Sequence, residues 1–230
     1  MADVGAVFDR LGRRYGPQHW WPAETRFEVI VGAILMAQTS WTRVEEAIGN
    51  LRRARALDPH VLAAMPLPRL RALVKPAGLY RQKPRRLKGF CEHLVRTADG
   101  DLDRFFARDL PDLRRELLSL DGVGPETADS ILLYAGEFPT FVVDAYTIRV
   151  GRRIGWFATN RYEDVKAFFE SRIGPDLARY REFHALVVVH GKQTCRPRPR
   201  CGVCPVEDRC AYARAADPAE ASNSYKNAPK

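Results

Sequence analysis

The chain has 230 residues, of which 46% are hydrophobic and 28% charged, values that are ordinary for a globular protein with one large or two small domains. Its longest apolar run, Val29 to Ala37, has nine residues, which excludes a membrane-spanning helix because such a helix needs about 20. The 37 Lys and Arg against 28 Asp and Glu leave a net charge of +9, which favours nucleic acid as a partner, although a solvated basic face gives the same balance.

Helical periodicity runs through the chain from its first residues. Apolar residues recur at spacings of three and four, and Pro or Gly residues interrupt the runs. The expected helices are, in chain order, Asp3–Tyr15, Arg26–Ala37, Trp41–Ala54, Pro59–Met65, Leu67–Val74, Lys83–Arg96, Leu110–Ser119, Glu126–Ala135, Ala145–Gly155, Tyr162–Ile173 and Leu177–Gly191. Residues 138–143 form a short extended stretch, and residues 215–230 have the composition of a disordered tail. We therefore predict an all-α protein.

Four of the five cysteines lie within sixteen residues near the C-terminus, in the pattern C-x5-C-x2-C-x5-C formed by Cys195, Cys201, Cys204 and Cys210. The N-terminal segment is charged and amphipathic, unlike a signal peptide, so we expect an intracellular, cytoplasmic protein with reduced thiols. Cysteines this close then indicate a metal centre. Zinc ribbons usually pair two C-x2-C knuckles, and a single knuckle between two lone cysteines favours a 4Fe–4S cluster over zinc.

The loop between the first two cysteines carries Arg196, Arg198 and Arg200, interleaved with prolines that stiffen it. These arginines are candidates for contact with DNA phosphates, and balancing the negative charge of a thiolate cluster is the alternative.

A sharp turn with two glycines, Gly122 and Gly124, joins two of the expected helices. Gly permits the positive φ of a tight reversal, and the following helix start offers backbone N–H groups to an anion such as a phosphate. Helix–Gly–helix turns are also often purely structural. Twenty residues beyond Gly124 lies Asp144, at the start of another expected helix. Its carboxylate suits an N-cap, and the same group is a candidate for catalysis.

Four further segments accompany these features, namely 35–39, 78–83, 143–150 and 190–195. In order and spacing, the hairpin, the aspartate, the cysteines and these segments resemble the endonuclease III branch of the helix-hairpin-helix (HhH-GPD) DNA glycosylases, over residues 26–210. The resemblance implies an enzyme of base excision repair that flips a damaged base out of duplex DNA and breaks its N-glycosidic bond. It also implies a monomer associated with the nucleoid.

The resemblance implies a two-lobed all-α helix-hairpin-helix glycosylase fold. A helical barrel domain would span residues 24–137, and an iron–sulfur cluster domain would combine 1–23 with 138–214.

The same resemblance assigns roles to particular residues. Asp144 matches the catalytic aspartate, which stabilises positive charge on the deoxyribose and orients or deprotonates water. Gln38 and Leu79 match residues that fill the space left by the flipped base, with a helix-end polar residue and a core leucine as the alternatives. Trp41, Tyr80 and Tyr146 are candidates for stacking on the flipped base, and each is also a plausible core aromatic.

Two features depart from the family pattern, and a third position bears on the substrate. Bifunctional members carry a lysine two residues after the second hairpin glycine, where this chain has Glu126, and a carboxylate cannot form a Schiff base. We therefore expect a monofunctional enzyme, with Glu126 either a spectator or a neighbour of Asp144. The first inter-cysteine loop has five residues where the family typically has six. Ala33 replaces the glutamate of the adenine-removing branch, which argues against adenine–oxoguanine mispairs as substrate.

The segments Gln38–Thr42 and Gly122–Asp129 are closer to the lysine-less members that act on alkylated purines than to those that act on oxidised pyrimidines. Three other functions stay open: a helix-hairpin-helix protein that binds damaged DNA without cutting it, a bifunctional lyase that uses Lys83 or Lys192, and a zinc protein that shares only the cysteine spacing. The retained Asp144 argues against the first, because a pure binder gains little from a carboxylate near phosphates.

Overall fold

The computed structural model describes residues 2–215, and helices of three kinds account for all of their regular structure. The predicted all-α class is therefore confirmed. The chain divides into two compact units, Trp21–Phe138, here called the central unit, and Met1–Trp20 with Pro139–Lys230, here called the discontinuous unit. The expected tail, 215–230, lies outside the described residues except for Ala215.

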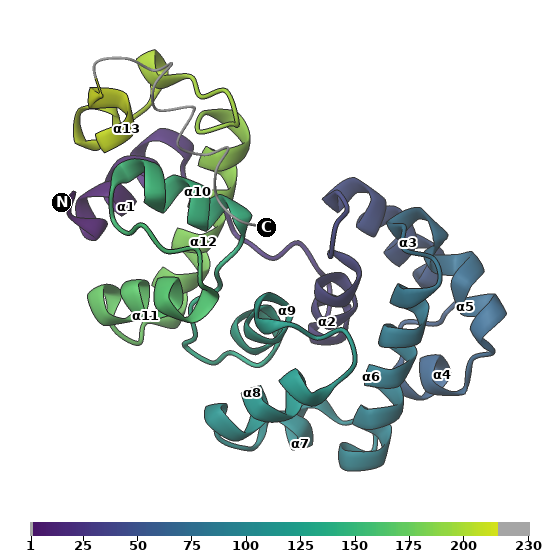
Figure 1. Ribbon diagram of the computed structural model, residues 1–230. Coiled ribbons are helices and arrows are strands. Elements are labelled where there is room, and N and C mark those ends of the chain that lie inside the picture. Colours follow the sequence, from purple (N-terminus) through teal and green to yellow (C-terminus); the bar gives the residue numbers. More distant parts are fainter. Residues whose placement is uncertain (1, 216–230) are drawn as a thin grey trace. The chain divides into compact units, whose positions relative to one another are not determined.

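The central unit is built from successive short helices (Figure 1). They are α2 (Arg26–Leu35), α3 (Trp41–Arg53), α4 (Pro59–Ala64), α5 (Leu67–Val74), the 3-10 turn η1 (Lys75–Ala77), α6 (Gln82–Ala98), α7 (Leu102–Phe106), α8 (Leu110–Ser119), α9 (Pro125–Ser130) and the π-helical turn η2 (Ile131–Ala135). Every residue of α2 after the first is buried, which accounts for the long apolar run as a core helix. No described helix is long and apolar enough to cross a membrane.

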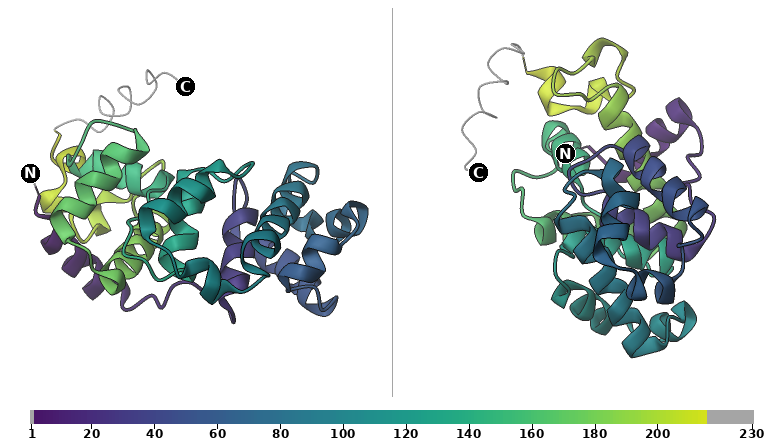
Figure 2. Two further views of the ribbon diagram at one scale, coloured as in Figure 1. Left: turned by 90° about the horizontal axis from the view of Figure 1, so that it is seen from below. Right: turned by 90° about the vertical axis from the view of Figure 1, so that its right-hand side faces the viewer.

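The discontinuous unit joins the N-terminal helix to the C-terminal part of the chain. It contains α1 (Val4–Tyr15), α10 (Ala145–Ile154), α11 (Tyr162–Ile173), α12 (Leu177–Gln193), the 3-10 turns η3 (Cys201–Val203) and η4 (Glu207–Arg209), and α13 (Ala211–Arg214). Although they are far apart in sequence, α1 and α12 pack against each other (Figures 1 and 2). The core is aromatic: the rings of Phe141 and Phe169 stack at 4.4 Å, and Trp156 meets Phe169 edge-on at 5.5 Å.

Side-chain caps set many of the helix starts. A side-chain oxygen at the N-cap accepts a hydrogen bond from a backbone N–H of the first turn in seven helices, at Asp3, Thr25, Asp58, Asp101, Asp109, Asp144 and Asp176. Each such cap stabilises its helix by about 1 kcal/mol.

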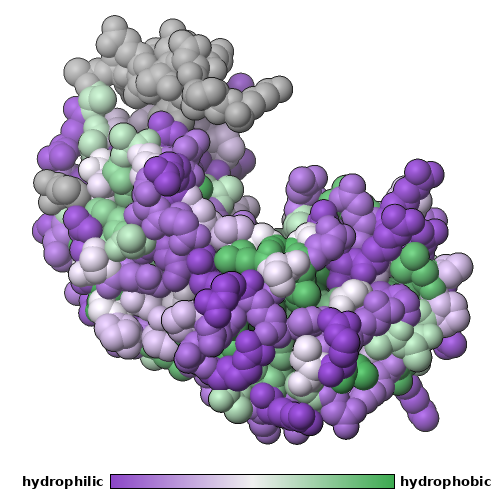
Figure 3. All heavy atoms as spheres, turned by 60° about the horizontal axis from the view of Figure 1, so that its bottom comes forward, coloured by the Kyte–Doolittle hydropathy of each residue, from purple (hydrophilic) through white to green (hydrophobic). Residues whose placement is uncertain are grey.

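Polar side chains predominate on the face of the molecule drawn in Figure 3, with smaller hydrophobic areas between them.

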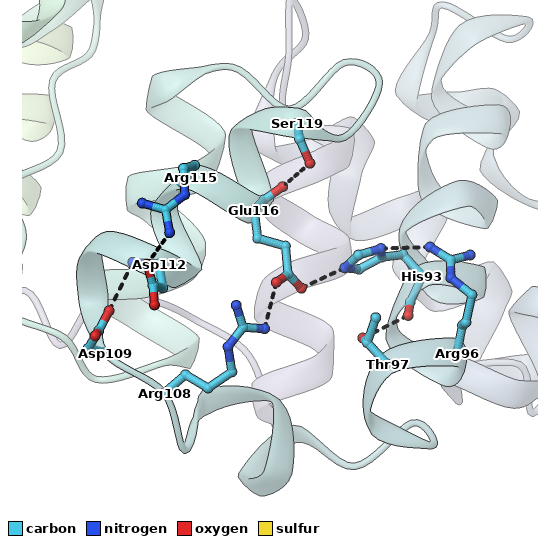
Figure 4. A network of polar contacts seen from close by, with 9 residues as sticks. All are labelled: His93, Arg96, Thr97, Arg108, Asp109, Asp112, Arg115, Glu116 and Ser119. Atoms are coloured by element: carbon cyan, nitrogen blue, oxygen red, sulfur yellow. Dashed lines mark hydrogen bonds and ion pairs between the residues drawn. The ribbon is translucent and has the colours of Figure 1, made fainter.

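Ion pairs stabilise the hairpin formed by α8 and α9, one between its two helices and others between α8 and neighbouring residues. Arg114 of α8 donates from Nε and Nη2 to the two carboxylate oxygens of Asp129 in α9, at 2.9 and 3.1 Å, and Asp129 is fully buried. On α8, Glu116 lies between His93 Nε2, at 2.7 Å, and Arg108 Nη1, at 2.5 Å (Figure 4). Burial acts to raise the pKa of Glu116, but the bonds from His93 and Arg108 outweigh it and hold that pKa below its ordinary value.

Candidate functional site

The two hairpin glycines have different structural requirements. Gly122 has φ +73°, a backbone conformation that favours glycine, and a Cβ there would lie 1.9 Å from Arg86 Nε, so the Arg86 side chain would also have to move. Gly124 has an ordinary φ of −87°, and a Cβ there would meet nothing within 4 Å. The folded chain itself therefore does not require glycine at 124, and the space beside it is open. Glu126 follows on the exposed first turn of α9.

Asp144 is the N-cap of α10 and directly follows the buried segment Phe141–Val143. Its Oδ1 accepts hydrogen bonds from the backbone N and the Oγ1 of Thr147, at 2.7 and 2.8 Å, which confirms the N-cap interpretation. Its Oδ2 lies 3.9 Å from Nε2 of His184, and the Asp144 side chain is 13% exposed. The cap thus fixes one oxygen and the rotamer, while the other oxygen faces a histidine that the sequence analysis did not single out.

His184 and Lys192 both lie on α12, and His184 is the one that lies near Asp144. Burial lowers the pKa of His184, Lys192 lowers it further, and Asp144 acts in the opposite direction. The Lys192 Nζ lies 5.6 Å from the ring centre of Trp20 and 5.9 Å from that of Tyr146. A cation, a carboxylate and two aromatic faces are therefore grouped within the discontinuous unit.

Gln38 and Leu79 share an uncommon backbone conformation. Their φ values are +55° and +43°, in the left-handed region that side chains other than glycine seldom adopt. Gln38 is exposed and lies beyond the end of α2, and Leu79 is half-buried, which rules out a fully buried core leucine. Strained non-glycine residues cluster at functional sites, so both positions stay candidates for contact with a ligand.

The aromatic candidates have different surroundings. Tyr80 is 55% exposed, with the Arg81 guanidinium 5.6 Å from its ring centre, so it is not a core residue. Trp41 is half-buried and meets Trp21 edge-on at 5.5 Å, and Trp21 in turn packs against Tyr134 at 5.2 Å. Tyr146, half-buried on α10, packs so closely on α12 that a Cβ on Gly191 would lie 2.5 Å from its ring.

All four clustered cysteines line one pocket in the discontinuous unit, together with His190, Arg153 and Tyr212. Their side chains do not stand at metal-binding distances, since no group of three or more His, Cys, Asp or Glu within residues 2–215 forms a metal site. Burial raises the pKa of Cys201, Cys204 and Cys210, to about 11 for Cys204, and neighbouring thiols add to the effect. The donor set, four thiols around one pocket, fits a thiolate-bound metal centre that displaces protons on binding.

Two arginines of α10 hold the loop that starts at the first cysteine. Arg149 donates to the backbone carbonyls of Cys195 and Gly191, at 2.9 and 2.8 Å. Arg153, 7% exposed, donates to the carbonyls of Arg196 and Pro197, at 2.6 and 2.9 Å, and approaches Cys195 Sγ at 3.4 Å. The loop is therefore anchored through its backbone, and the side chains of its own arginines at 196, 198 and 200 are left exposed.

The family description "HhH-GPD superfamily base excision DNA repair protein" matches residues 31–175, which is more than half of the chain. The chain belongs to this superfamily. The match begins in α2, takes in the α8–α9 hairpin and Asp144, and ends just after α11. It therefore covers both glycines and the capped aspartate in one continuous stretch, and HhH-GPD membership makes the chain a base excision repair DNA glycosylase.

Relatives of known sequence and structure agree with this assignment. A protein of Methanocaldococcus jannaschii with a provisional assignment as a DNA repair glycosylase is 45% identical over 85% of this chain and 90% of its own length. Endonuclease III of Escherichia coli is 29% identical over 83% and 86%.

Two solved structures share the HhH-GPD glycosylase fold. A trapped endonuclease III–DNA covalent intermediate has a TM-score of 0.79 at 25% identity, and the match covers 92% of this chain and 95% of the endonuclease III chain. The 3-methyladenine DNA glycosylase MagIII of H. pylori, bound to 1,N6-ethenoadenine, has a TM-score of 0.75 at 26% identity, covering 84% and 98%.

Proposed function

We propose that this HhH-GPD protein is a monofunctional DNA glycosylase that hydrolyses the N-glycosidic bond of a damaged base in duplex DNA. The observation that carries the proposal is the environment of Asp144, whose Oδ1 is fixed by Thr147 while its Oδ2 makes no part of the cap. A carboxylate held in one rotamer at a helix N-terminus is stabilised as an anion. It is therefore suited to a reaction in which positive charge develops on the substrate.

The chemistry assigned to Asp144 follows from the bond that breaks. As the bond between the base and the deoxyribose C1′ lengthens, the sugar acquires oxocarbenium character, and a nearby carboxylate stabilises this charge. The same carboxylate orients a water and accepts a proton as the water attacks C1′, so that the products are the free base and an abasic sugar. A general base of this kind is worth about 10²- to 10⁴-fold in rate, and an electrostatic contribution about 10²- to 10³-fold.

The proposal that the enzyme lacks lyase activity rests on Glu126. It occupies the second position of α9, two residues after Gly124, where bifunctional members of the family have the lysine that attacks the sugar. A carboxylate has no amine with which to form the Schiff base that leads to strand cleavage. Water is then the nucleophile, and the DNA backbone next to the abasic site stays intact.

Duplex DNA is the proposed partner. The fold of the chain gives no reason for a glycine at position 124, where the space beside the backbone is open. A DNA phosphate that approaches the backbone of the hairpin there would supply that reason. Gln38 and Leu79, held in left-handed conformations, are proposed to fill the space that the flipped base leaves. The exposed arginines of the cysteine loop, Arg196, Arg198 and Arg200, supply further phosphate contacts.

An alkylated purine is the proposed substrate in preference to an oxidised pyrimidine. Alkylated bases are electron-poor, and aromatic faces such as those of Trp41, Tyr80 and Tyr146 attract electron-poor rings. Support comes from the structural similarity to a 3-methyladenine glycosylase that was solved with an etheno-adenine.

Cys195, Cys201, Cys204 and Cys210 are proposed to hold a 4Fe–4S cluster. When bound, the cluster would link the ends of the cysteine segment and stiffen it; hydrolysis of the glycosidic bond needs no electron transfer. Arg149 and Arg153 hold the first loop of this segment through backbone carbonyls, which keeps the three exposed arginines in a defined position.

The experiment that tests the proposal uses duplexes with one lesion each: an etheno or methylated purine, thymine glycol, uracil or an abasic site. The wild type is compared with Asp144→Asn, with and without hot alkali. Cleavage that appears only after alkali, on the alkylated purine, and falls by about 10²-fold or more in Asp144→Asn is the expected result.

Asp176→Asn is the matched control for this substitution. Asp176 caps α12 through a bond from the Arg179 backbone N at 2.9 Å, as Asp144 caps α10. Because Asn is as good an N-cap as Asp, both variants keep their helices, and Asp176→Asn is expected to keep its activity. Full activity in Asp144→Asn overturns the proposal, and tight binding with no cleavage of any lesion by the wild type favours a damage-binding protein.

A second candidate function is a bifunctional lyase, and the position of Lys192 favours this residue as the attacking amine. Lys192 is exposed and lies in the same unit as Asp144, over the rings of Trp20 and Tyr146. Lys83, the other amine considered, has a pKa lowered to about 8 by burial and by Arg86, but its ammonium is fully buried and donates to the Ala77 carbonyl at 2.6 Å. A borohydride-trapped complex that disappears in Lys192→Met would establish this function.

A further inference from the structure

His184 lies behind the oxygen of Asp144 that the helix cap does not use. It projects from the buried face of α12, where its side chain is 6% exposed, and its Nε2 lies 3.9 Å from Asp144 Oδ2. Thr147 already fills the hydrogen-bonding positions around Oδ1. The carboxylate is therefore bounded on one side by its own helix and on the other by the imidazole.

The surroundings of His184 disfavour the charged form of its imidazole. Burial lowers the pKa of His184, and the positive charge of Lys192, eight residues further along α12, lowers it further against the opposing effect of Asp144. A neutral ring that carries its proton on Nε2 presents an N–H to the carboxylate. The separation of 3.9 Å is longer than a hydrogen bond, and catalytic contacts are often long in ligand-free enzymes and tighten in the complex.

We propose that His184 is a positioning residue for the glycosylase reaction: its imidazole N–H orients Oδ2 of Asp144. The inference rests on the catalytic role proposed for Asp144. A cation at the same place would form an ion pair with Asp144 and compete with the charge that develops on the sugar. A neutral donor holds the oxygen in place and leaves its full negative charge to act on the transition state.

Two substitutions separate this role from simple packing. His184→Leu keeps an apolar side chain of similar size in a buried position but removes the N–H, and His184→Gln keeps a neutral N–H donor. We expect His184→Leu to release the damaged base about 10- to 100-fold more slowly in single turnovers, because a carboxylate displaced by a fraction of an ångström loses catalytic alignment. His184→Gln is expected to recover most of the rate. Affinity for a duplex with an abasic-site analogue is expected to stay within about threefold in both, because neither change removes a group assigned to DNA binding.

A matched control comes from another histidine–carboxylate pair, which lies in the central unit. His93 contacts Glu116 in the central unit, at 2.7 Å from Nε2 to Oε1, and neither residue has a role in the proposed reaction. His93→Leu is expected to lower the melting temperature and to leave the single-turnover rate unchanged at a temperature where the variant is folded.

The outcomes distinguish the two levels of the argument. If Asp144→Asn is as fast as the wild type, the proposed function itself fails. If Asp144→Asn is inactive but His184→Leu is as fast as the wild type, the proposed function stands and the role of His184 is overturned. Equal loss of rate in His184→Leu and His184→Gln with unchanged DNA affinity also overturns it, because the N–H would then be irrelevant.

Discussion

Removal of Arg114 tests whether its ion pair with Asp129 holds the hairpin together. In Arg114→Met the fully buried carboxylate of Asp129 loses both of its hydrogen bonds from the guanidinium, at 2.9 and 3.1 Å. Deleting one partner of a buried ion pair typically destabilises a protein by about 3–5 kcal/mol, because the remaining charge stays desolvated. Because the Arg114 side chain is 21% exposed, water can reach part of the vacated space. We therefore expect a loss near the lower limit, about 3 kcal/mol.

The assay is thermal unfolding of the full chain, with Arg115→Met as the control. A loss of about 3 kcal/mol corresponds to a fall in melting temperature of about 6–12 °C for a protein of this length. Arg115 is the next residue of α8, but its side chain is 75% exposed and its partner Asp112 is one turn away on the same helix. Exposed pairs of this kind contribute about 0–1 kcal/mol, so Arg115→Met is expected to shift the melting temperature by only a few degrees at most.

The double substitution Arg114→Met with Asp129→Asn completes the test. Replacing the carboxylate by an amide removes the buried charge, so the double variant is expected to be more stable than Arg114→Met alone. The reasoning is refuted if Arg114→Met is no less stable than Arg115→Met. It is also refuted if the two substitutions of the pair add without any compensation.

Three further predictions concern the proposed DNA contacts and the cysteine cluster. Gly124→Ala is expected to keep a free energy of unfolding within about 1 kcal/mol of the wild type but to bind duplex DNA more weakly. Gly122→Ala is expected to be clearly less stable than the wild type. A Gly124→Ala variant less stable than Gly122→Ala would contradict the structure. Gln38→Gly is expected to leave stability nearly unchanged, because relief of about 1–2 kcal/mol of left-handed strain offsets the backbone entropy of glycine, and to weaken binding to damaged relative to intact duplex in a titration. Cys201→Ser is expected to lose bound iron in elemental analysis while the buried Cys91→Ser keeps it, and equal iron in both would exclude the proposed cluster.

The helical part of the fold could be predicted because burial on one face imposes a period of 3.6 residues on the sequence. Short elements carry too little of that pattern. The helix Leu102–Phe106 has five residues, begins at the Asp101 cap and was not predicted. The expected helix Glu126–Ala135 becomes a π-helical turn from Ile131 onward. The sequence could not predict this change, because a single turn with a wider hydrogen-bond spacing leaves the same apolar pattern.

The extended segment before Asp144 shows what local pattern leaves open. Its apolar residues predicted an extended conformation, but no strand partner lies among residues 2–215. The backbone N–H groups bond instead to side chains of α11: Phe141 N donates to Glu170 Oε1 at 2.9 Å, and Val143 N donates to Tyr162 Oη at 3.3 Å. These partners lie 29 and 19 residues away and have no signature in the segment itself.

Residues that act through distant contacts were the ones that sequence reasoning missed. His184 lies in an apolar run of α12, where a histidine resembles any satisfied core residue, and its contact with Asp144 spans 40 residues. Arg149 and Arg153 lie on α10, but their acceptors are backbone carbonyls more than 40 residues away, which no side-chain pattern marks. By contrast, the order and spacing of the glycines, Asp144 and the cysteines can be read directly from the sequence, and they led to the family that the comparisons show.

The two interpretations of Asp144, a helix cap and a catalytic carboxylate, describe one physical requirement. A catalytic carboxylate must keep a single rotamer and remain charged while partly shielded from water. A helix start provides both: the bonds from Thr147 fix Oδ1, and the positive end of α10 stabilises the anion in a side chain that is 13% exposed. Asn forms the same cap without the charge, whereas Ala loses the cap and the charge together. Asp144→Asn is therefore the substitution that separates catalysis from folding at this position, and Asp144→Ala cannot do so.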